Sequence, residues 1–189
     1  MKKNILFFII SIIIILITIF TCTCINKYHI LKDIYNMQNN LNKIENYSYL
    51  NNQTTQIIKK NNDIRVDKFD ENITIYFDSQ NNKLYNLDNN NMTMKIIDNG
   101  INHISVPLQK IDFINKSIIY NIFNTKITSS YSEYYIQIDS IEYTIDKQTG
   151  IVKKIIWINS NDIYTYTDYK FNDNTLNIIK PDLSKYTIK

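Results

Sequence analysis

The N-terminal segment constrains this chain more than any other part of it. Two lysines stand within the first four residues, and a run of apolar residues without a charge extends from Ile5 to Phe20. A short cationic head followed by a long apolar stretch is typical of an export signal. The two cysteines of the chain, Cys22 and Cys24, follow directly. The sequence therefore predicts that residues 1–24 form an anchor and that residues 25–189 form one exported domain on the extracytoplasmic face of the cell membrane.

Two kinds of anchor remain open for this segment. A lipoprotein signal is cut directly before the cysteine that carries the lipid, which here is either Cys22 or Cys24. The residue before such a cysteine is usually small, whereas Thr precedes both cysteines of this chain. An uncleaved anchor would cross the membrane as a helix, and residues 5–21 span about 25 Å against a hydrocarbon core of roughly 30 Å. Only one residue separates the cysteines, so a disulfide between them would be strained.

Charge argues against a nucleic-acid partner. The formal net charge is +3, and removal of Lys2 and Lys3 leaves +1 on the exported domain. A nearly neutral domain lacks the basic footprint by which proteins bind phosphate backbones.

Two helices are expected. Over residues 26–46 the apolar positions repeat at intervals of four and three, which aligns them in one stripe that packs on a sheet or, alternatively, forms a coiled-coil seam. The stripe consists of Ile30, Ile34, Met37, Leu41 and Ile44. The second helix is expected over residues 105–124, where Ser105 can cap and Pro107 fits the first turn. Its apolar side consists of Leu108, Ile111, Ile114, Ile118 and Ile122.

Most of the remaining chain follows a period of two, typical of half-buried strands. Strands are expected over residues 73–77, 83–87, 92–97, 134–138, 141–145, 151–158, 163–171 and 176–179, with Pro181 ending the sheet. In the strand 151–158, Ile151, Lys153, Ile155 and Trp157 should share one face. Short Asn-rich turns join neighbouring strands. The pattern shows neither βαβ alternation nor an internal repeat, and predicts an α+β fold with a large antiparallel sheet and two helices set against it.

No catalytic, cofactor or metal site is expected. His29 and His103 lack the spacing of metal ligands, and two glycines, Gly100 and Gly150, are too few for a phosphate-binding loop. Asp67, Asp70 and Glu71 form an acidic stretch that is expected to be a solvated turn. The sequence thus predicts a protein that is not an enzyme.

Tyrosines provide the remaining candidate site. Tyr164 and Tyr166 share one face of a predicted strand with Asp168 and Lys170, so this face is expected to be at least partly exposed. Tyrosine combines an apolar ring with a polar hydroxyl and is enriched at interfaces. Tyr164 and Tyr166 are therefore a candidate partner surface. A strand over 176–179 at the edge of the sheet would also allow a homodimer to form by pairing with the same strand of a second copy.

The order of these elements resembles the LolA/LppX-like lipoprotein superfamily. The resemblance rests on a tether, an amphipathic helix that leads into LNKIENYSY, a meander, a central helix, and then YTIDKQTGIVKKIIW and YTYTDYKF. It implies a curved antiparallel sheet, an open half-barrel, that wraps around the helices. Within the superfamily the chain is most similar to the GerS-like spore-germination lipoproteins of clostridia.

The resemblance implies two alternative functions. The germination branch is non-enzymatic, and binds and activates a cell-wall amidase of the spore cortex, which places it at the membrane and between forespore and mother cell. The carrier branch holds a lipid or acyl chain in the hollow between sheet and helices. Two alternatives are weaker. A pseudopilin-like subunit would need the Gly and the acidic residue of a pilin leader, which this sequence lacks. A secreted hydrolase would need a catalytic cluster, and the sequence shows none.

Overall fold

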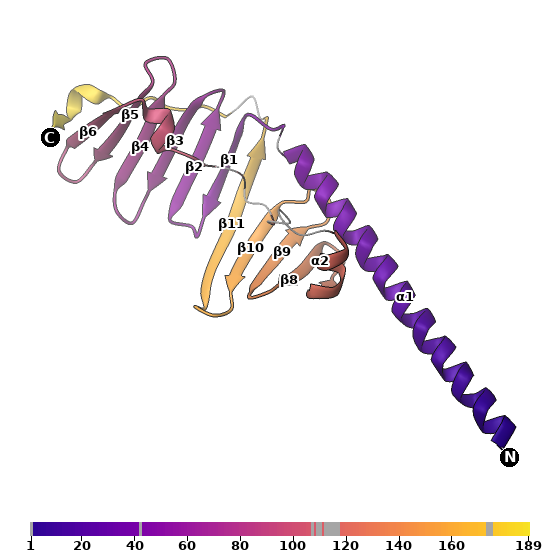
Figure 1. The fold of residues 1–189 in the computed structure, drawn as a ribbon. Helices are drawn as coiled ribbons and strands as arrows, with labels where there is room; N and C mark the ends of the chain where they lie inside the picture. The colour runs from indigo at the N-terminus through magenta and orange to yellow at the C-terminus, as the bar shows by residue number, and fades with distance from the viewer. Residues whose placement is uncertain (1, 42, 107, 109–110, 112–117, 173–175) are drawn as a thin grey trace.

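A single helix contains the apolar N-terminal run and leads into the folded domain. The computed structural model describes residues 2–41, 43–106, 108, 111, 118–172 and 176–189. Helix α1 (Lys2–Leu41) is continuous over 40 residues and ends five residues before the predicted end at residue 46. Residues 5–23 are exposed, and apart from the Phe20 ring, which stacks on Phe123, packing against the domain begins at Cys24. Figure 1 shows α1 leaving the sheet as a straight rod, with the N-terminus far from the strands.

The two parts of α1 differ in burial as their sequences predict. By length and composition α1 is able to cross a membrane, since its most apolar window has a mean hydropathy of 3.2 and none of that window is buried. A long apolar N-terminal helix of this kind is compatible with either a membrane anchor or a signal sequence. In the second part Ile34 and Leu41 are buried and Ile30 and Met37 pack partly, which confirms the predicted stripe.

The strands form one open sheet dominated by antiparallel pairs. They are β1 (Tyr47–Asn51), β2 (Thr55–Lys60), β3 (Asp63–Lys68), β4 (Ile73–Asp78), β5 (Lys83–Asp88), β6 (Thr93–Asp98), β7 (Thr125–Ser129), β8 (Glu133–Ile138), β9 (Ile141–Asp146), β10 (Val152–Trp157), β11 (Asp162–Phe171) and β12 (Thr187–Ile188). Their order is β12-β6-β5-β4-β3-β2-β1-β11-β10-β9-β8-β7. The sheet thus consists of an N-terminal meander, β1–β6, and a C-terminal meander, β7–β11, joined where β1 pairs with β11 (Figure 1). The α+β class is confirmed.

The N-terminal meander contains a repeat that the pattern analysis missed. Strands β3, β4, β5 and β6 begin at residues 63, 73, 83 and 93, so each unit of strand and turn takes ten residues. In two consecutive turns an aspartate side chain accepts backbone N–H groups two and three residues ahead: Asp78 from Gln80 and Asn81, and Asp88 from Asn90 and Asn91. These Asx turns end in the left-handed residues Asn82 and Met92; Asn tolerates this conformation well. The expectation of no internal repeat is therefore wrong.

The two faces of the sheet are covered by different segments. On the front face, α1 and the described residues of the segment after β6 (100–106, 108 and 111) cover a core that runs through both meanders and includes Ile34, Tyr49, Phe77 and Ile145. On the back face, Leu183 and Tyr186 of the C-terminal tail pack on a smaller core under β4–β6. The members of this back core are Tyr76, Tyr85, Leu87 and Met94.

The C-terminal tail differs from the prediction. Residues 176–179 form no strand, and Pro181 does not end the sheet, because β12 pairs in parallel with β6 beyond it. The tail instead crosses the back of the N-terminal meander, where Lys60 Nζ donates to the Leu176 carbonyl at 2.6 Å and Arg65 Nη1 to the Ile179 carbonyl at 2.5 Å. An edge-strand homodimer through residues 176–179 loses its basis, since the edges of the described sheet are β12 and β7.

The second helix is shorter than predicted. Residues 105, 106, 108 and 111 are not helical, and the described helix α2 covers Ile118–Asn124. The rest of the predicted span, including Pro107 and Ile114, lies outside the described residues. Leu108 and Ile111 are buried as expected, although they belong to an irregular segment.

A bulge corrects the predicted faces of β10. The pairing of β10 with β9 shifts between Val152 and Lys154, so strict alternation fails there. Val152 and Ile155, expected on opposite faces, both belong to the front core, and Trp157 at the end of the strand is 46% exposed.

Candidate ligand-binding hollow

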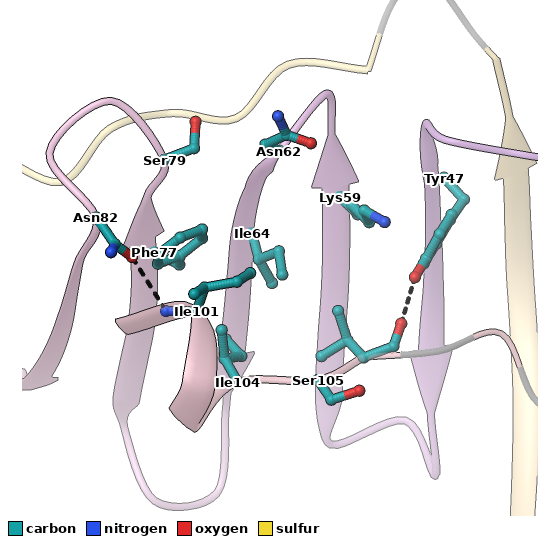
Figure 2. A pocket seen from close by; sticks show the side chains of 11 residues that line it. Tyr47, Lys59, Asn62, Ile64, Phe77, Ser79, Asn82, Ile101, Ile104 and Ser105 are labelled. Carbon is teal, nitrogen blue, oxygen red and sulfur yellow. Dashed lines mark hydrogen bonds between the residues drawn. The ribbon is translucent and has the colours of Figure 1, made fainter. Parts of the chain in front are cut away.

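A hollow on the front face of the N-terminal meander is the first of two candidate sites. Its floor consists of side chains from β1, β2, β3 and β4, and its cover consists of a 3-10 helix, η1 (Gly100–His103), and the extended residues that follow (Figure 2). Its volume is about 710 Å³, within the range of ligand pockets. The lining residues are Tyr47, Lys59, Asn62, Ile64, Phe77, Ser79, Asn82, Ile101, Ile104, Ser105 and Val106.

Three polar contacts hold the cover in place. The Tyr47 hydroxyl donates to the carbonyl of Val106, and this is one of the dashed contacts in Figure 2. The backbone N–H of Gly100 donates to the Asn82 carbonyl at 2.9 Å, and the N–H of Ile101 donates to the Asn82 side chain at 3.4 Å. A Cβ at position 100 would lie 2.6 Å from the backbone N of Leu84, so only glycine lets the cover begin this close to β5.

The lining of the hollow combines apolar and uncharged polar side chains with one charge. Ile64, Phe77, Ile101, Ile104 and Val106 supply the apolar wall, and Lys59 is the one charged side chain among the described lining residues. The Lys59 ammonium lies 5.7 Å from the centre of the Tyr47 ring, a cation–π distance. Within the described part of the chain no carboxylate forms an ion pair with Lys59. The arrangement can therefore bind an apolar chain together with a neutral or anionic head group.

Tyr47 acts in this hollow as a neutral hydrogen-bond donor. Burial raises the pKa of its hydroxyl from 10.0 to about 12, because a phenolate would lose its hydration there. The hydroxyl thus keeps its proton, and with it the bond to the cover, throughout the physiological range.

A second hollow of about 800 Å³ lies on the back face of the C-terminal meander. Tyr135, Thr144, Lys154 and Thr165 lie opposite one another across β8, β9, β10 and β11 and form part of its floor. At one end Lys153 Nζ lies 3.3 Å from Glu133 and 3.1 Å from Asp146.

The charges in this second hollow compensate one another. Burial acts to raise the pKa of Asp146, but hydrogen bonds from Thr149 and the neighbouring Lys153 ammonium outweigh it, and the net pKa is lowered. The hydrogen bond to Asp146 raises the pKa of Lys153. Since both charged forms are stabilised internally, the cluster is best explained as a link between β8, β9 and β10.

The two tyrosines of the predicted partner surface, Tyr164 and Tyr166, differ in burial. Tyr166 is 6% exposed and packs edge-on against Tyr49 at 6.1 Å, whereas Tyr164 is 38% exposed. The partner surface stays a prediction, and of the two tyrosines only Tyr164 offers appreciable surface for it. Cys22 is exposed and Cys24 is half-buried, both as free thiols.

The other singled-out polar residues do not form a site. Asp67 pairs with Arg65 at 2.8 Å and accepts the Thr74 hydroxyl at 2.8 Å, so it is a structural residue of the sheet. Among the described residues, no group of three or more His, Cys, Asp or Glu side chains could hold a metal ion.

An exposed apolar patch at the closed end of the β10–β11 hairpin was missed by the sequence analysis. The hairpin patch comprises Trp157, Ile158, Ile163 and Tyr164, with exposed fractions of 46, 39, 51 and 38%. By the strand register Trp157 and Tyr164 lie on one face of the hairpin, and Ile158 and Ile163 lie on the other. The signal for it was present, since bulky apolar residues stand directly on both sides of the polar turn 159–162. Polar residues normally occupy such positions at a hairpin end.

Comparisons with known proteins leave the family open: no protein-family model matches the chain, and no curated protein matches it.

Proposed function

We propose that this chain is a membrane-tethered, non-enzymatic carrier with a LolA-like half-barrel, and that it holds an acyl chain with a neutral or anionic head in the hollow of Figure 2. The observation that supports this function is the hollow itself, which combines apolar walls with a single cation at its rim. Apolar surface removed from water stabilises the bound state by roughly 25 cal/mol per Å². Lys59 would favour a fatty acid or an anionic lipid over a neutral one.

A photo-crosslinking experiment tests the carrier. The full chain in lipid nanodiscs is supplied with a fatty acid that bears a diazirine on its chain, and the labelled peptides are mapped after irradiation. Labels are expected on residues 101–106 and on β3 or β4. Lys59→Met should lower this labelling, and Lys154→Met, on the opposite face of the sheet, should leave it unchanged. Labels confined to α1 would contradict the carrier.

A second function, activation of a partner enzyme, is supported by the hairpin patch. Trp157 and Tyr164 are exposed on the same face of the hairpin, and Trp and Tyr side chains supply much of the binding energy at protein interfaces. Following the resemblance to the germination lipoproteins, we propose a cortex cell-wall amidase as the partner, bound during sporulation on the extracytoplasmic side.

Affinity capture separates this function from the carrier. The tagged full chain is recovered from sporulating cells, and bound proteins are identified by mass spectrometry. A stoichiometric amidase that is lost on Trp157→Ser or Tyr164→Ser would support activation. Tyr131→Ser is the matched control, because Tyr131 is fully exposed and lies outside the hairpin patch. Capture of the same amidase by all three variants would show that the partner binds elsewhere.

A further inference from the structure

Helix α2 docks on α1 at the level where the exposed apolar run ends. The rings of Phe20 and Phe123 are stacked, with centroids 6.3 Å apart and an interplanar angle of 25°. Two turns further along α1, Lys27 Nζ donates to the carbonyl of Ile122 at 3.2 Å and to that of Thr125 at 2.8 Å. Phe20, Cys24 and Lys27 lie at intervals of four and three, and therefore on one face of α1. This face fixes α2 against the helix (Figure 1).

The stacked ring pair is left uncovered by the protein. Phe20 is 58% exposed and Phe123 is 61% exposed, although each ring is in contact with the other. Five of the seven residues of α2 are aliphatic or aromatic. The exposed Phe123 ring continues the apolar surface of residues 5–20, all of which are exposed as well. Such a surface is stable where apolar groups, not water, surround it.

The distribution of charge favours a lipid surface as the medium around this site. Residues 1–32, which include the start of α1, and residues 113–132, which include α2, contain no Asp or Glu, although the chain has 18 acidic residues. On the domain side of the apolar run, the described lysines of these stretches are Lys27, Lys32 and Lys126. Lysines near the surface of a membrane are attracted to anionic lipid head groups, and acidic residues would be repelled.

From these contacts we infer that α2 lies in the head-group region of the bilayer that α1 enters, with the Phe20–Phe123 pair at the boundary of the hydrocarbon and Lys27 on its polar side. The inference rests on the uncleaved form of the proposed tether, which keeps Phe20, and adds a second membrane contact made by the folded domain. Aromatic rings at this depth are typical of membrane anchors. The contact would hold the sheet at a fixed height and orientation above the membrane.

Fluorescence quenching by brominated lipids tests this contact in the full chain. The native protein has one tryptophan, Trp157, which lies outside the contact. Two further forms carry Phe123→Trp or Ile12→Trp together with Trp157→Phe. All three are placed in nanodiscs of phosphatidylcholine and phosphatidylglycerol with bromine near either the carbonyl end or the middle of the acyl chains. We expect quenching at position 123 mainly by the shallow bromine, at position 12 mainly by the deep bromine, and none at Trp157.

The other outcomes separate the inference from the tether. Quenching at position 12 without quenching at position 123 would overturn the contact of α2 and leave the tether intact. Absence of quenching at both positions would overturn the tether and the inference together. Equal quenching at positions 123 and 157 would overturn the inference too, because the whole domain would then adsorb without a defined contact at α2.

Discussion

The two meanders have similar strand lengths and similar turns, but they are covered differently. The N-terminal meander is buried on both faces, by residues 100–106, 108 and 111 in front and by the C-terminal tail behind. The C-terminal meander is covered in front by α1 and leaves its back face to water. In β4 four of the six residues are buried, whereas in β8 only Ile136 is.

This difference shows that a strand's burial depends on segments far away in the chain. Tyr76 and Phe77 are neighbours in β4 and point to opposite faces, yet both are almost fully buried because two different segments cover them. Tyr135 and Ile136 are neighbours in β8, and Tyr135 is 42% exposed because nothing in the described structure covers it. Coverage, more than strand sequence, separates the two meanders.

Removal of the C-terminal tail should have the largest effect on stability and should abolish the difference in coverage between the two meanders. A chain that stops before Leu183 would expose the back core of β4–β6, including Tyr76 and Leu87. Loss of two packed side chains and of β12 should lower the free energy of unfolding by about 3–5 kcal/mol. Hydrogen exchange is the measurement: β4–β6 should lose protection and β8–β10 should keep it. Uniform loss in both meanders would show that they do not differ in this way.

Gly150→Ala tests the cover of the other meander. Gly150 has φ +74°, and a Cβ there would lie 2.6 Å from Cβ of Met37 on α1. The left-handed backbone and the clash should together cost about 2–4 kcal/mol. Denaturant unfolding of the full chain in detergent measures the loss. A cost below that of Gly100→Ala, which is crowded but not left-handed, would contradict this account of Gly150.

Gln38→Leu should have a smaller effect on the same contact. The Gln38 side chain is buried, donates to the Gly150 carbonyl at 3.2 Å and accepts the Ile111 N–H at 3.1 Å. Its loss leaves buried backbone groups without a partner and should cost about 1–3 kcal/mol. Unfolding followed by denaturant titration checks the value. Exposed Gln53→Leu is the control and should be nearly neutral, so equal costs would argue against the role of Gln38.

The ion pair of Lys153 and Asp146, on the open back face of the C-terminal meander, should contribute least to the free energy of unfolding. Its contribution should depend on pH. The folded pKa of Asp146 is lowered, so its contribution is present above the unfolded pKa of about 3.9 and is lost as the pH falls through the folded value. The folded pKa of Lys153 is raised, so its contribution is present below about 10.4 and is lost as the pH rises through the folded value.

Lys153→Met should therefore cost about 0.2–1 kcal/mol near neutral pH, since Lys153 is 41% exposed and screened by solvent. The difference from the parent should shrink in acid, as Asp146 becomes protonated in both. Unfolding free energies measured across this pH range check it, with Lys154→Met as the control. A difference that grows in acid would refute the proposed linkage.

The candidate hollow illustrates what could not be predicted. Lys59, Phe77 and Ile104 come from three segments spread over 45 residues, and none has a local sequence signal. The predicted partner surface also depends on a feature that the sequence pattern does not show, the left-handed backbone of Asp168. It places Tyr166 and Tyr169, three residues apart, together against Tyr49, a result that simple alternation does not give.

The sequence by itself determined the local features of this protein: the apolar N-terminal helix, the stripe on its second part, most hairpin strands and the Asn-rich turns between them. These follow from interactions within three to ten residues, which periodicity and turn chemistry report directly. Only the tertiary structure decided that β1 joins β11, that the tail covers the back of β4–β6, and that α2 meets α1 at Phe20. Each of these depends on contacts between segments distant in the chain, and the free energy that selects them comes from burial of surfaces that no single segment contains.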